Sequence, residues 1–315
     1  DAKFSMTNEQ KAEGQASIRE DGDVEPWMGI CHGWAAAAIV VPQPKSIVKA
    51  KGFDGTEIIW YPSEIRAMAS LAWANGSSGS NFIGGRCDSK DARTDEETGR
   101  ILQQSCFDNN PATFHLALGN MVGRKKLSFV MDKTFDYEVW NQPISSYEFE
   151  YFDVTDPEKT SKDWKKVVAN YADFKKDDRF QKYRGQGLEK IVGVTATVVY
   201  LAETFPQSGA KAAPNNLVRE TYTYDLELHK EGRELVAKGG EWHENTHPDF
   251  LWVPTKDGVA SNDYDSVDVG FSLRKEPNEI LSETAAKASR SGYPLCQVLE
   301  KLVGKSSGDD SYKCE

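Results

Sequence analysis

Hydrophobic residues at helical spacing mark the first quarter of the chain. Trp27–Trp34 is a dense run of glycines and bulky side chains that leads directly into four alanines, so we expect a turn followed by a closely packed helix that ends at Pro42. Apolar residues at helical spacing after Pro62 predict a second helix, which runs from Pro62 to about Ala74. The pattern also predicts a helix at 8–20 and a short strand at Ile58–Trp60.

Beyond a long polar loop that ends near Asn110, the pattern becomes typical of β-strands. Short apolar or alternating runs predict strands at 112–118, 127–131, 138–140, 147–152 and 191–201. Strict alternation over Thr221–Leu228 predicts another strand, which turns at Glu231-Gly232 into a hairpin with 233–237. The remaining segments are predicted as helices at 155–183 and 278–291 and as an irregular aromatic stretch at 242–254.

This order of elements favours an α+β fold, because helices come first and antiparallel strands follow. We expect one catalytic domain over 1–315. Within it, a mainly helical lobe would cover 1–110, a mainly β lobe 111–275, and a C-terminal helix and tail 276–315.

The charge balance excludes some classes of protein. There are 38 Lys and Arg against 49 Asp and Glu, a net charge of −11, which repels phosphate backbones and argues against nucleic-acid binding. No apolar run approaches the roughly 20 residues that a membrane-spanning helix needs. The sequence that starts at Asp1 has no charged and apolar leader, so we expect either a cytosolic protein or one whose leader has been removed.

Five cysteines favour an oxidising, extracellular setting. Cys87 and Cys106 flank a polar stretch, and Cys296 and Cys314 flank a second one in the tail, so two disulfides would each tie down a short loop. The sequon at Asn75 lies in a Gly- and Ser-rich loop that could carry a sugar. Five unrelated thiols in a cytosolic protein remain the alternative.

Cys31 is then left as a thiol, and it is the candidate nucleophile. It follows a glycine turn at the predicted start of a helix, where the positive end of the helix dipole favours the thiolate. The indole of Trp34, three residues on, could form one wall of a cleft. A buried structural cysteine is the alternative interpretation.

A thiolate needs a base and the base needs an orienting acceptor. His115 lies in a predicted apolar strand and faces away from its hydrophobic side, and Asp132 ends the next predicted strand. Two neighbouring strands would place Asp132 beside His115, with Asp136 as the rival acceptor. His32 is adjacent to the nucleophile in sequence and is expected to point elsewhere, whereas His229 is expected to be solvated.

Metal ligation is a weaker hypothesis. His243 and His247 would need a helix to align their rings, and the residues between and after them disfavour one, so a wall of a substrate cleft is the preferred interpretation. An acidic loop with Asn262 could bind Ca²⁺ through its carboxylates, although it lacks the glycine and terminal glutamate of an EF-hand. Its candidate ligands are Asp263, Asp265 and Asp268.

Several segments resemble one known family. Val139–Pro143 resembles the core of the peptide through which plants sense the oomycete cell-wall transglutaminase elicitor, and Gly29–Ala35 resembles the nucleophile segment of that family. The Phe-His-Leu and Val-Met-Asp segments fall in the same order. The resemblance runs from about Trp27 to about Pro254, and members related to the oomycete proteins also occur in bacteria.

The resemblance implies a secreted protein-glutamine γ-glutamyltransferase with Ca²⁺-dependent activity and protein substrates that present Gln and Lys side chains. It also implies a fold akin to papain-like cysteine proteases, with one lobe carrying the cysteine and the other carrying His and Asp. Recognition of Val139–Pro143 by a plant receptor is a further implied partnership.

The resulting hypothesis is that Cys31 forms a thioester with a Gln side chain and that His115 moves the protons. Backbone N–H groups near Cys31, with the indole of Trp27 or Trp34, would hold the oxyanion. Trp34, Trp140 and Trp242 are candidates for walls that exclude water, or they pack in the core. The alternatives are a papain-like protease or amidase, and a non-enzymatic recognition or adhesion protein.

Overall fold

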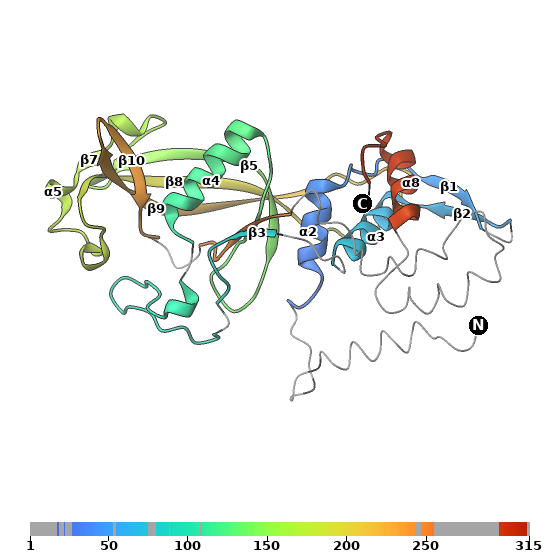
Figure 1. Cartoon of the computed structure of the whole chain (residues 1–315), viewed down its shortest axis with the longest axis horizontal. Helices are drawn as coiled ribbons and strands as arrows, with labels where there is room; N and C mark the ends of the chain where they lie inside the picture. The colour runs from blue at the N-terminus through green and yellow to red at the C-terminus, as the bar shows by residue number, and fades with distance from the viewer. Residues whose placement is uncertain are drawn as a thin grey trace. The chain divides into compact units, whose positions relative to one another are not determined.

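A computed structural model describes residues 18, 22, 27–52, 55–74, 80–87, 89–107, 109–243, 247–254 and 296–313. The chain divides into two compact units. The helical unit comprises Asp1–Asn81, Glu203–Asn215 and Pro254–Glu315, and the sheet unit comprises Phe82–Ala202 and Asn216–Val253. Figure 1 shows the elements of each unit.

The helical unit contains helices α2 (Cys31–Val40), α3 (Pro62–Ala74) and α8 (Cys296–Ser307), with an antiparallel hairpin of β1 (Val48–Lys51) and β2 (Glu57–Trp60). The predictions of α2, α3 and the β2 strand are confirmed. Helix α8 lies where the sequence predicted a tail. Its buried residues Leu299, Leu302 and Val303 have the spacing of one helix face, which explains why this segment is helical.

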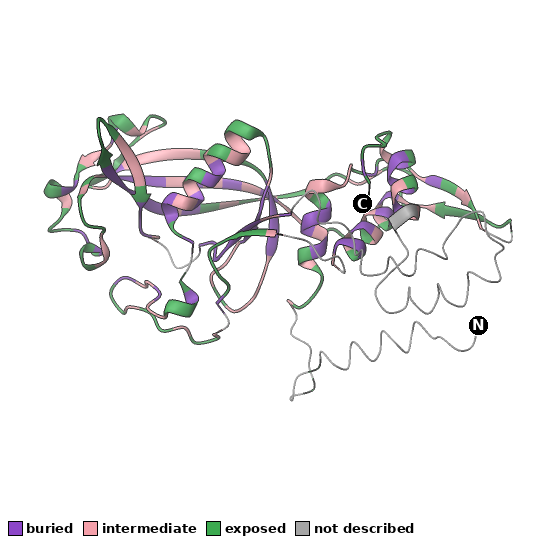
Figure 2. Ribbon diagram, viewed as in Figure 1, coloured by how far each residue is buried: buried purple, intermediate pink, exposed green. Residues whose placement is uncertain are grey.

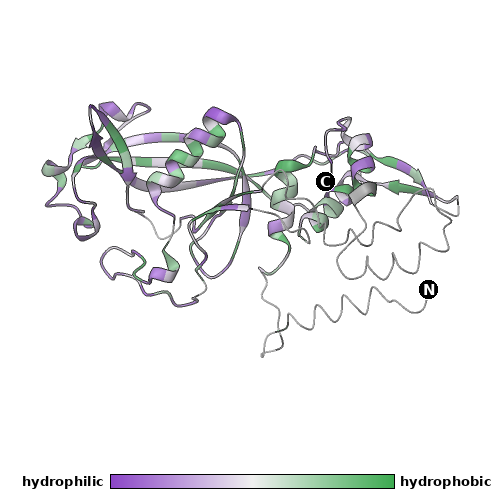
Figure 3. Ribbon diagram, in the orientation of Figure 1, coloured by the Kyte–Doolittle hydropathy of each residue, from purple (hydrophilic) through white to green (hydrophobic). Residues whose placement is uncertain are grey.

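Helices α2 and α3 approach each other closely at Gly33. A side chain here would collide with the carbonyl oxygen of Ser70 and would place its Cβ 2.7 Å from the backbone nitrogen of Ala74. The alanines that follow Trp34 include the fully buried Ala35, and the ribbon of α2 is mostly apolar by hydropathy (Figure 3). The first turn of α2 therefore lies against the last turn of α3.

The sheet unit is built on a nine-stranded sheet whose main path runs β10-β9-β8-β5-β4-β11-β3, with β6 paired to β5 and β7 to β8. The pairs whose registers are given are antiparallel. This mixture of helices and antiparallel strands confirms the coarse α+β prediction. The strands are β3 (Ser80–Ile83), β4 (Val130–Asp132), β5 (Asn141–Asp153), β6 (Asp156–Ser161), β7 (Ala169–Asn170), β8 (Leu188–Ala202), β9 (Asn216–Glu231), β10 (Glu234–Gly239) and β11 (Leu251–Pro254).

The long strands β8 and β9 hold the core of this unit. The alternation in β9 is confirmed, because Tyr222, Tyr224, Leu226 and Leu228 are all buried. Buried and more exposed residues alternate along β8 as well (Figure 2). The predicted hairpin of β9 and β10 is confirmed.

The predicted strand at 112–118 is wrong, because this segment forms helix α4 (Pro111–Ala117), continued by the π-helix η2 (Leu118–Lys125). The side chain of Asn110 accepts a hydrogen bond from the N–H of Ala112 at 2.9 Å, and Pro111 occupies the first turn, so the sequence carries a strong helix start. The helix buries Phe114 against the rings of Tyr222 and Tyr224.

The predicted helix at 155–183 is also wrong. The segment turns at Asp153 into β6, continues through β7, and otherwise contains only single turns: η3 (Trp164–Lys166), α5 (Tyr171–Phe174) and η4 (Gln181–Tyr183). Arg184 holds the end of this segment, because its guanidinium donates to the buried carboxylates of Asp178 and Asp225, both at 2.8 Å. The structure of this segment therefore depends on a long-range ion pair and not on its helical spacing of charged residues.

The strand predicted at 138–140 is wrong as well, because β5 begins only at Asn141; the one at 147–152 lies inside β5, and the one at 127–131 overlaps β4. The disulfide Cys87–Cys106 is confirmed. Four predictions concern residues outside the described part of the chain and stay predictions. They are the disulfide to Cys314, the sequon at Asn75, the helix at 278–291 and, apart from Ile18, the helix at 8–20.

Gly33→Ala tests the contact between α2 and α3. The added methyl group cannot fit without separating the two helices, so we expect the free energy of unfolding to fall by about 1–3 kcal/mol, as for overpacked cores. The matched control is Gly29→Ala, because a Cβ at Gly29 meets nothing within 4 Å. Urea unfolding followed by tryptophan fluorescence measures both; equal stability of the two variants would show that the contact is not tight.

Candidate functional site

Cys31 is the first residue of α2 and is half-buried. Its sulfur is a thiol and not part of a disulfide. The N-cap residue Ile30 provides no side-chain hydrogen bond, and the first turn carries no acidic residue. The positive end of the helix dipole is therefore left to act on the sulfur, which favours the thiolate.

The prediction that His32 points away from the nucleophile is wrong. Its ring makes a side-chain hydrogen bond with Cys31, and its Nε2 atom lies 3.2 Å from the carbonyl oxygen of Ala74. The hydrogen bond with Cys31 is the main cause that raises the pKa of His32, against the effect of burial. The sequence could not predict this orientation of His32, because it depends on tertiary packing that places the carboxyl end of α3 beside the ring.

His115 lies on α4 in the sheet unit, inside a group of aromatic rings. Its Nδ1 is 2.9 Å from the hydroxyl of Tyr224 and its Nε2 is 3.4 Å from the hydroxyl of Tyr151. The ring stacks on Phe149 with centroids 3.9 Å apart. Burial lowers the pKa of His115 to about 4, so this imidazole is neutral at neutral pH.

Asp132 ends β4 and is fully buried. Its Oδ1 accepts a hydrogen bond from the backbone N–H of Trp140 at 2.8 Å, while Oδ2 is buried without a hydrogen-bond partner among the described residues. Burial raises its pKa to about 8, and the charge of Asp249 adds to this rise.

The expected contact between His115 and an aspartate is not formed in the described part of the chain. Both ring nitrogens of His115 bond to tyrosines, and neither Asp132 nor Asp136 is a partner. Asp136 is exposed, and its carboxylate accepts from the N–H of Glu138. The roles of His115 and Asp132 in a triad with Cys31 stay predictions.

The four candidate tryptophans divide between the units. Trp27 and Trp34 are half-buried in the helical unit, and Nε1 of Trp34 has no hydrogen-bond partner among the described residues. In the sheet unit, Nε1 of Trp140 donates to Glu138 at 2.9 Å and Nε1 of Trp242 donates to the carbonyl oxygen of Asn109 at 3.0 Å.

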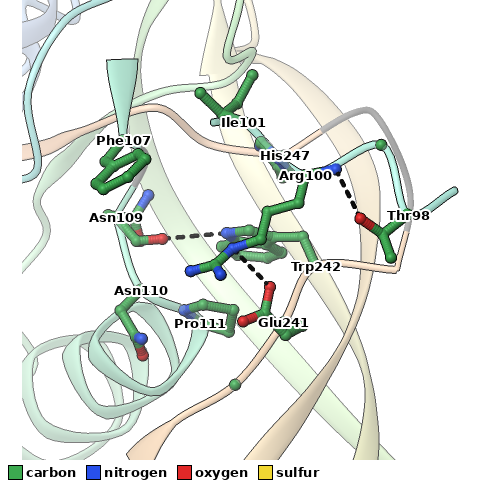
Figure 4. A pocket seen from close by; sticks show the side chains of 12 residues that line it. Thr98, Arg100, Ile101, Phe107, Asn109, Asn110, Pro111, Glu241, Trp242 and His247 are labelled. Atoms are coloured by element: carbon green, nitrogen blue, oxygen red, sulfur yellow. Dashed lines mark hydrogen bonds and ion pairs between the residues drawn. The ribbon is translucent and has the colours of Figure 1, made fainter. Parts of the chain in front are cut away.

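Trp242 also lines a pocket of about 230 Å³ in the sheet unit (Figure 4). Across the pocket, Nε of Arg100 pairs with the carboxylate of Glu241 at 3.1 Å. Burial raises the pKa of Glu241 to about 8 in spite of this partner. The pocket therefore combines one ion pair with hydrophobic walls from Ile101 and Phe107. The sequence offered no signal for Arg100 and Glu241, because they are far apart in the chain.

The three other histidines of the sheet unit make contacts within that unit, and His247 lines the pocket as a wall residue. Nε2 of His243 lies 2.7 Å from the buried carboxylate of Asp225, and His247 packs against the rings of Phe135 and Trp242. His229 is buried, so the expectation that it is solvated is wrong. Burial lowers the pKa of His247 to about 4.

The predicted calcium ligands Asp263, Asp265 and Asp268 lie outside the described residues. Within the described ranges, no group of three or more His, Cys, Asp or Glu side chains is placed to hold a metal ion. In the same part of the chain, no helix has both the length and the hydrophobicity to cross a membrane.

Comparison with known proteins identifies the family. The chain belongs to the transglutaminase elicitor family, whose sequence profile matches residues 5–283. A search of curated proteins finds no match.

Among solved structures, the chain resembles the GP42 transglutaminase from Phytophthora sojae, with a TM-score of 0.54 and 23% sequence identity. The match covers 90% of this chain and 64% of the GP42 chain, so this chain spans only part of the length of that protein. At this identity the likeness concerns the fold.

Asp132→Asn tests the buried carboxyl group. The pKa of Asp132 is about 8 in the folded protein and about 3.9 in an unfolded chain. Between these values only the folded state holds the proton, so the free energy of unfolding falls as pH rises from about 4 to about 8. We expect the wild type to lose stability across this window more steeply than Asp132→Asn.

Urea unfolding at several pH values provides the measurement. Asp156→Asn is the control for loss of an exposed carboxylate in the same unit. If the wild type and Asp132→Asn lost stability in parallel, Asp132 would not be held in its protonated form.

Proposed function

We propose that this protein is a secreted protein-glutamine γ-glutamyltransferase that forms Gln–Lys isopeptide bonds through a thioester on Cys31. The observation that carries the proposal is the half-buried thiol at the start of α2 in a member of the transglutaminase elicitor family. The division into a helical unit with the cysteine and a sheet unit supports a two-lobed, papain-like arrangement. A single catalytic domain would then comprise both units.

The reaction has two halves. The thiolate of Cys31 attacks the carbonyl carbon of a Gln γ-carboxamide, and ammonia leaves with a proton from an imidazolium. The neutral amine of a Lys side chain then attacks the thioester, gives its proton to the imidazole, and releases the thiolate. Every proton taken in one half is returned in the other, so the resting enzyme is regenerated.

The sequence assigns the imidazole to His115 and its support to Asp132. For that role His115 would have to exchange its 3.4 Å contact with Tyr151 for a contact with sulfur. It would also have to act as a base despite a pKa lowered to about 4. The assignment therefore requires a rearrangement around α4, and it stays a proposal.

The tetrahedral intermediate carries a negative oxygen that needs donors. Backbone N–H groups in the first turn of α2 and the indole N–H of Trp27 or Trp34 are the proposed donors. The unpartnered Nε1 of Trp34 supports this choice. Trp34, Trp140 and Trp242 are the proposed walls that exclude water, so that an amine competes successfully for the thioester.

The proposed function also includes secretion and a requirement for Ca²⁺. The Cys87–Cys106 disulfide supports an oxidising compartment. Carboxylates are the preferred donors of Ca²⁺, so the cluster of Asp263, Asp265 and Asp268 has suitable chemistry for the calcium that we propose this activity requires.

Cys31→Ala tests the activity directly. Without the sulfur no thioester forms, so we expect incorporation of a labelled primary amine into a Gln-containing protein to fall to background. The assay is run with Ca²⁺ and with chelator on wild type and variant, beside an assay for peptide cleavage. Cleavage without amine incorporation would indicate a protease or amidase, and activity in neither assay would indicate a recognition or adhesion protein.

We also propose that the partner of segment Val139–Pro143, a plant receptor, binds it after the segment has left the sheet. Asn141 and Gln142 are buried in β5, with 4% and 3% of their surface exposed, and Oδ1 of Asn141 accepts a hydrogen bond from Nε1 of Trp252 at 2.7 Å. In the folded protein a receptor would reach little of this segment.

A competition experiment on plant plasma membranes tests this mode of recognition. We expect a synthetic peptide that spans 134–150 to bind at least tenfold more tightly than the folded protein, and a protease digest of the protein to bind like the peptide. Protease inhibitors in the assay keep the folded sample intact. Equal affinity of the folded protein and the peptide would refute the need for exposure.

A further inference from the structure

The helical unit brings a thiol, an imidazole and a carbonyl group together without any residue from the sheet unit. The ring of His32 makes a hydrogen bond with Cys31 on one side, and its Nε2 lies 3.2 Å from the oxygen of Ala74 on the other. A carbonyl oxygen only accepts hydrogen bonds, so Nε2 carries a proton. In the neutral ring Nδ1 is then unprotonated and able to accept the proton of a thiol.

Packing holds this group in place. Ala74 is the last residue of α3, and Gly33 lets the first turn of α2 lie directly against the backbone of Ser70 and Ala74. The last turn of α3 contains no basic side chain that would compete for its terminal carbonyls. The acceptor that orients the His32 ring is therefore a backbone atom fixed by helix packing.

The start of α2 and the end of α3 favour opposite charges on Cys31 and His32. Cys31 lies at the positive end of α2, which favours a thiolate, and the His32 ring contacts the negative end of α3, which favours an imidazolium. Cys31 is the one titratable side chain whose charge acts on His32 among the described residues; the first turn of α2 has no acidic residue. In an ion pair of thiolate and imidazolium, the positive end of α2 stabilises the thiolate. The thiolate and the carbonyl of Ala74 stabilise the imidazolium against the opposing dipole of α2, in whose first turn His32 lies.

We propose that His32 takes the proton of Cys31, donates it to the leaving ammonia, and accepts the proton of the attacking amine, with the carbonyl of Ala74 as the orienting acceptor. This inference rests on the proposed transferase function and replaces His115 in it. In the first half, the S–H proton moves to His32, the C–N bond of the carboxamide breaks, and ammonia leaves with that proton. In the second half, the proton of the Lys amine returns to His32 as the C–S bond breaks.

Alkylation of Cys31 by iodoacetamide, followed by mass spectrometry across pH 4–9, tests the ion pair in the full chain. We expect the wild type to react well below the pKa of a free cysteine, about 8.5. His32→Gln should react at least about tenfold more slowly at pH 6.5, with its profile displaced toward that of a free thiol. His115→Gln and the control His229→Gln should keep the wild-type profile.

A wild-type profile in His32→Gln would overturn the inference, and a displaced profile in His115→Gln would return the role to His115. Because a variant of His32 could fold poorly, NMR titration of its ring in the wild type and in Cys31→Ser provides a second measurement. The pKa of His32 should fall when the sulfur is removed, and an unchanged value would also overturn the inference. A wild type that alkylates as expected but incorporates no amine would refute the transferase function and leave the ion pair intact.

Discussion

The close contact between the first turn of α2 and the last turn of α3 is the constraint on which the proposed chemistry of this protein depends. Gly33 makes the contact possible, because any side chain at that position would meet the backbone of α3. The contact places the carbonyl of Ala74 beside His32, and His32 in turn bonds to Cys31. One small residue thus permits the helix contact through which we propose that His32 ionises Cys31.

In the sheet unit, several ionisable groups are buried, and each of these is either neutral or paired with an opposite charge. His115 is surrounded by tyrosines and Phe149, and Asp132 is enclosed at the end of β4, so burial shifts both pKa values toward the neutral forms. Asp225, by contrast, is paired with Arg184 and His243, and these partners lower its pKa to about 2. Desolvation and ion pairing therefore determine the charge of these buried groups.

Local sequence patterns predicted the elements whose stability is local. The helix after Pro62 and the alternating strand around Tyr224 both show a hydrophobic period that matches their burial. The segment after Asn110 has the alternating apolar residues of a strand, but the N-cap Asn110 and Pro111 start a helix there. The segment before Arg184 has the charge spacing of a helix, but its structure depends on the ion pair of Arg184 with the distant Asp225.

In the candidate site, too, the sequence predicts local features but not contacts between distant residues. Cys31 could be chosen from its glycine turn and its place among the cysteines, because both are local features. The contact of His32 with Ala74, 42 residues away, could not be predicted, since it arises from helix packing. His115 and Asp132 were grouped by an assumed pairing of strands, and the helix at α4 removes that assumption.

The most direct test of the central claim is to trap the acyl-enzyme. The full chain is mixed with a Gln-containing peptide in the absence of amine, quenched in acid, digested, and examined by mass spectrometry. A thioester intermediate predicts that the fragment with Cys31 gains the mass of the whole peptide less one ammonia. An adduct that contains only a cleaved part of the peptide, or an adduct on another residue, would contradict the account.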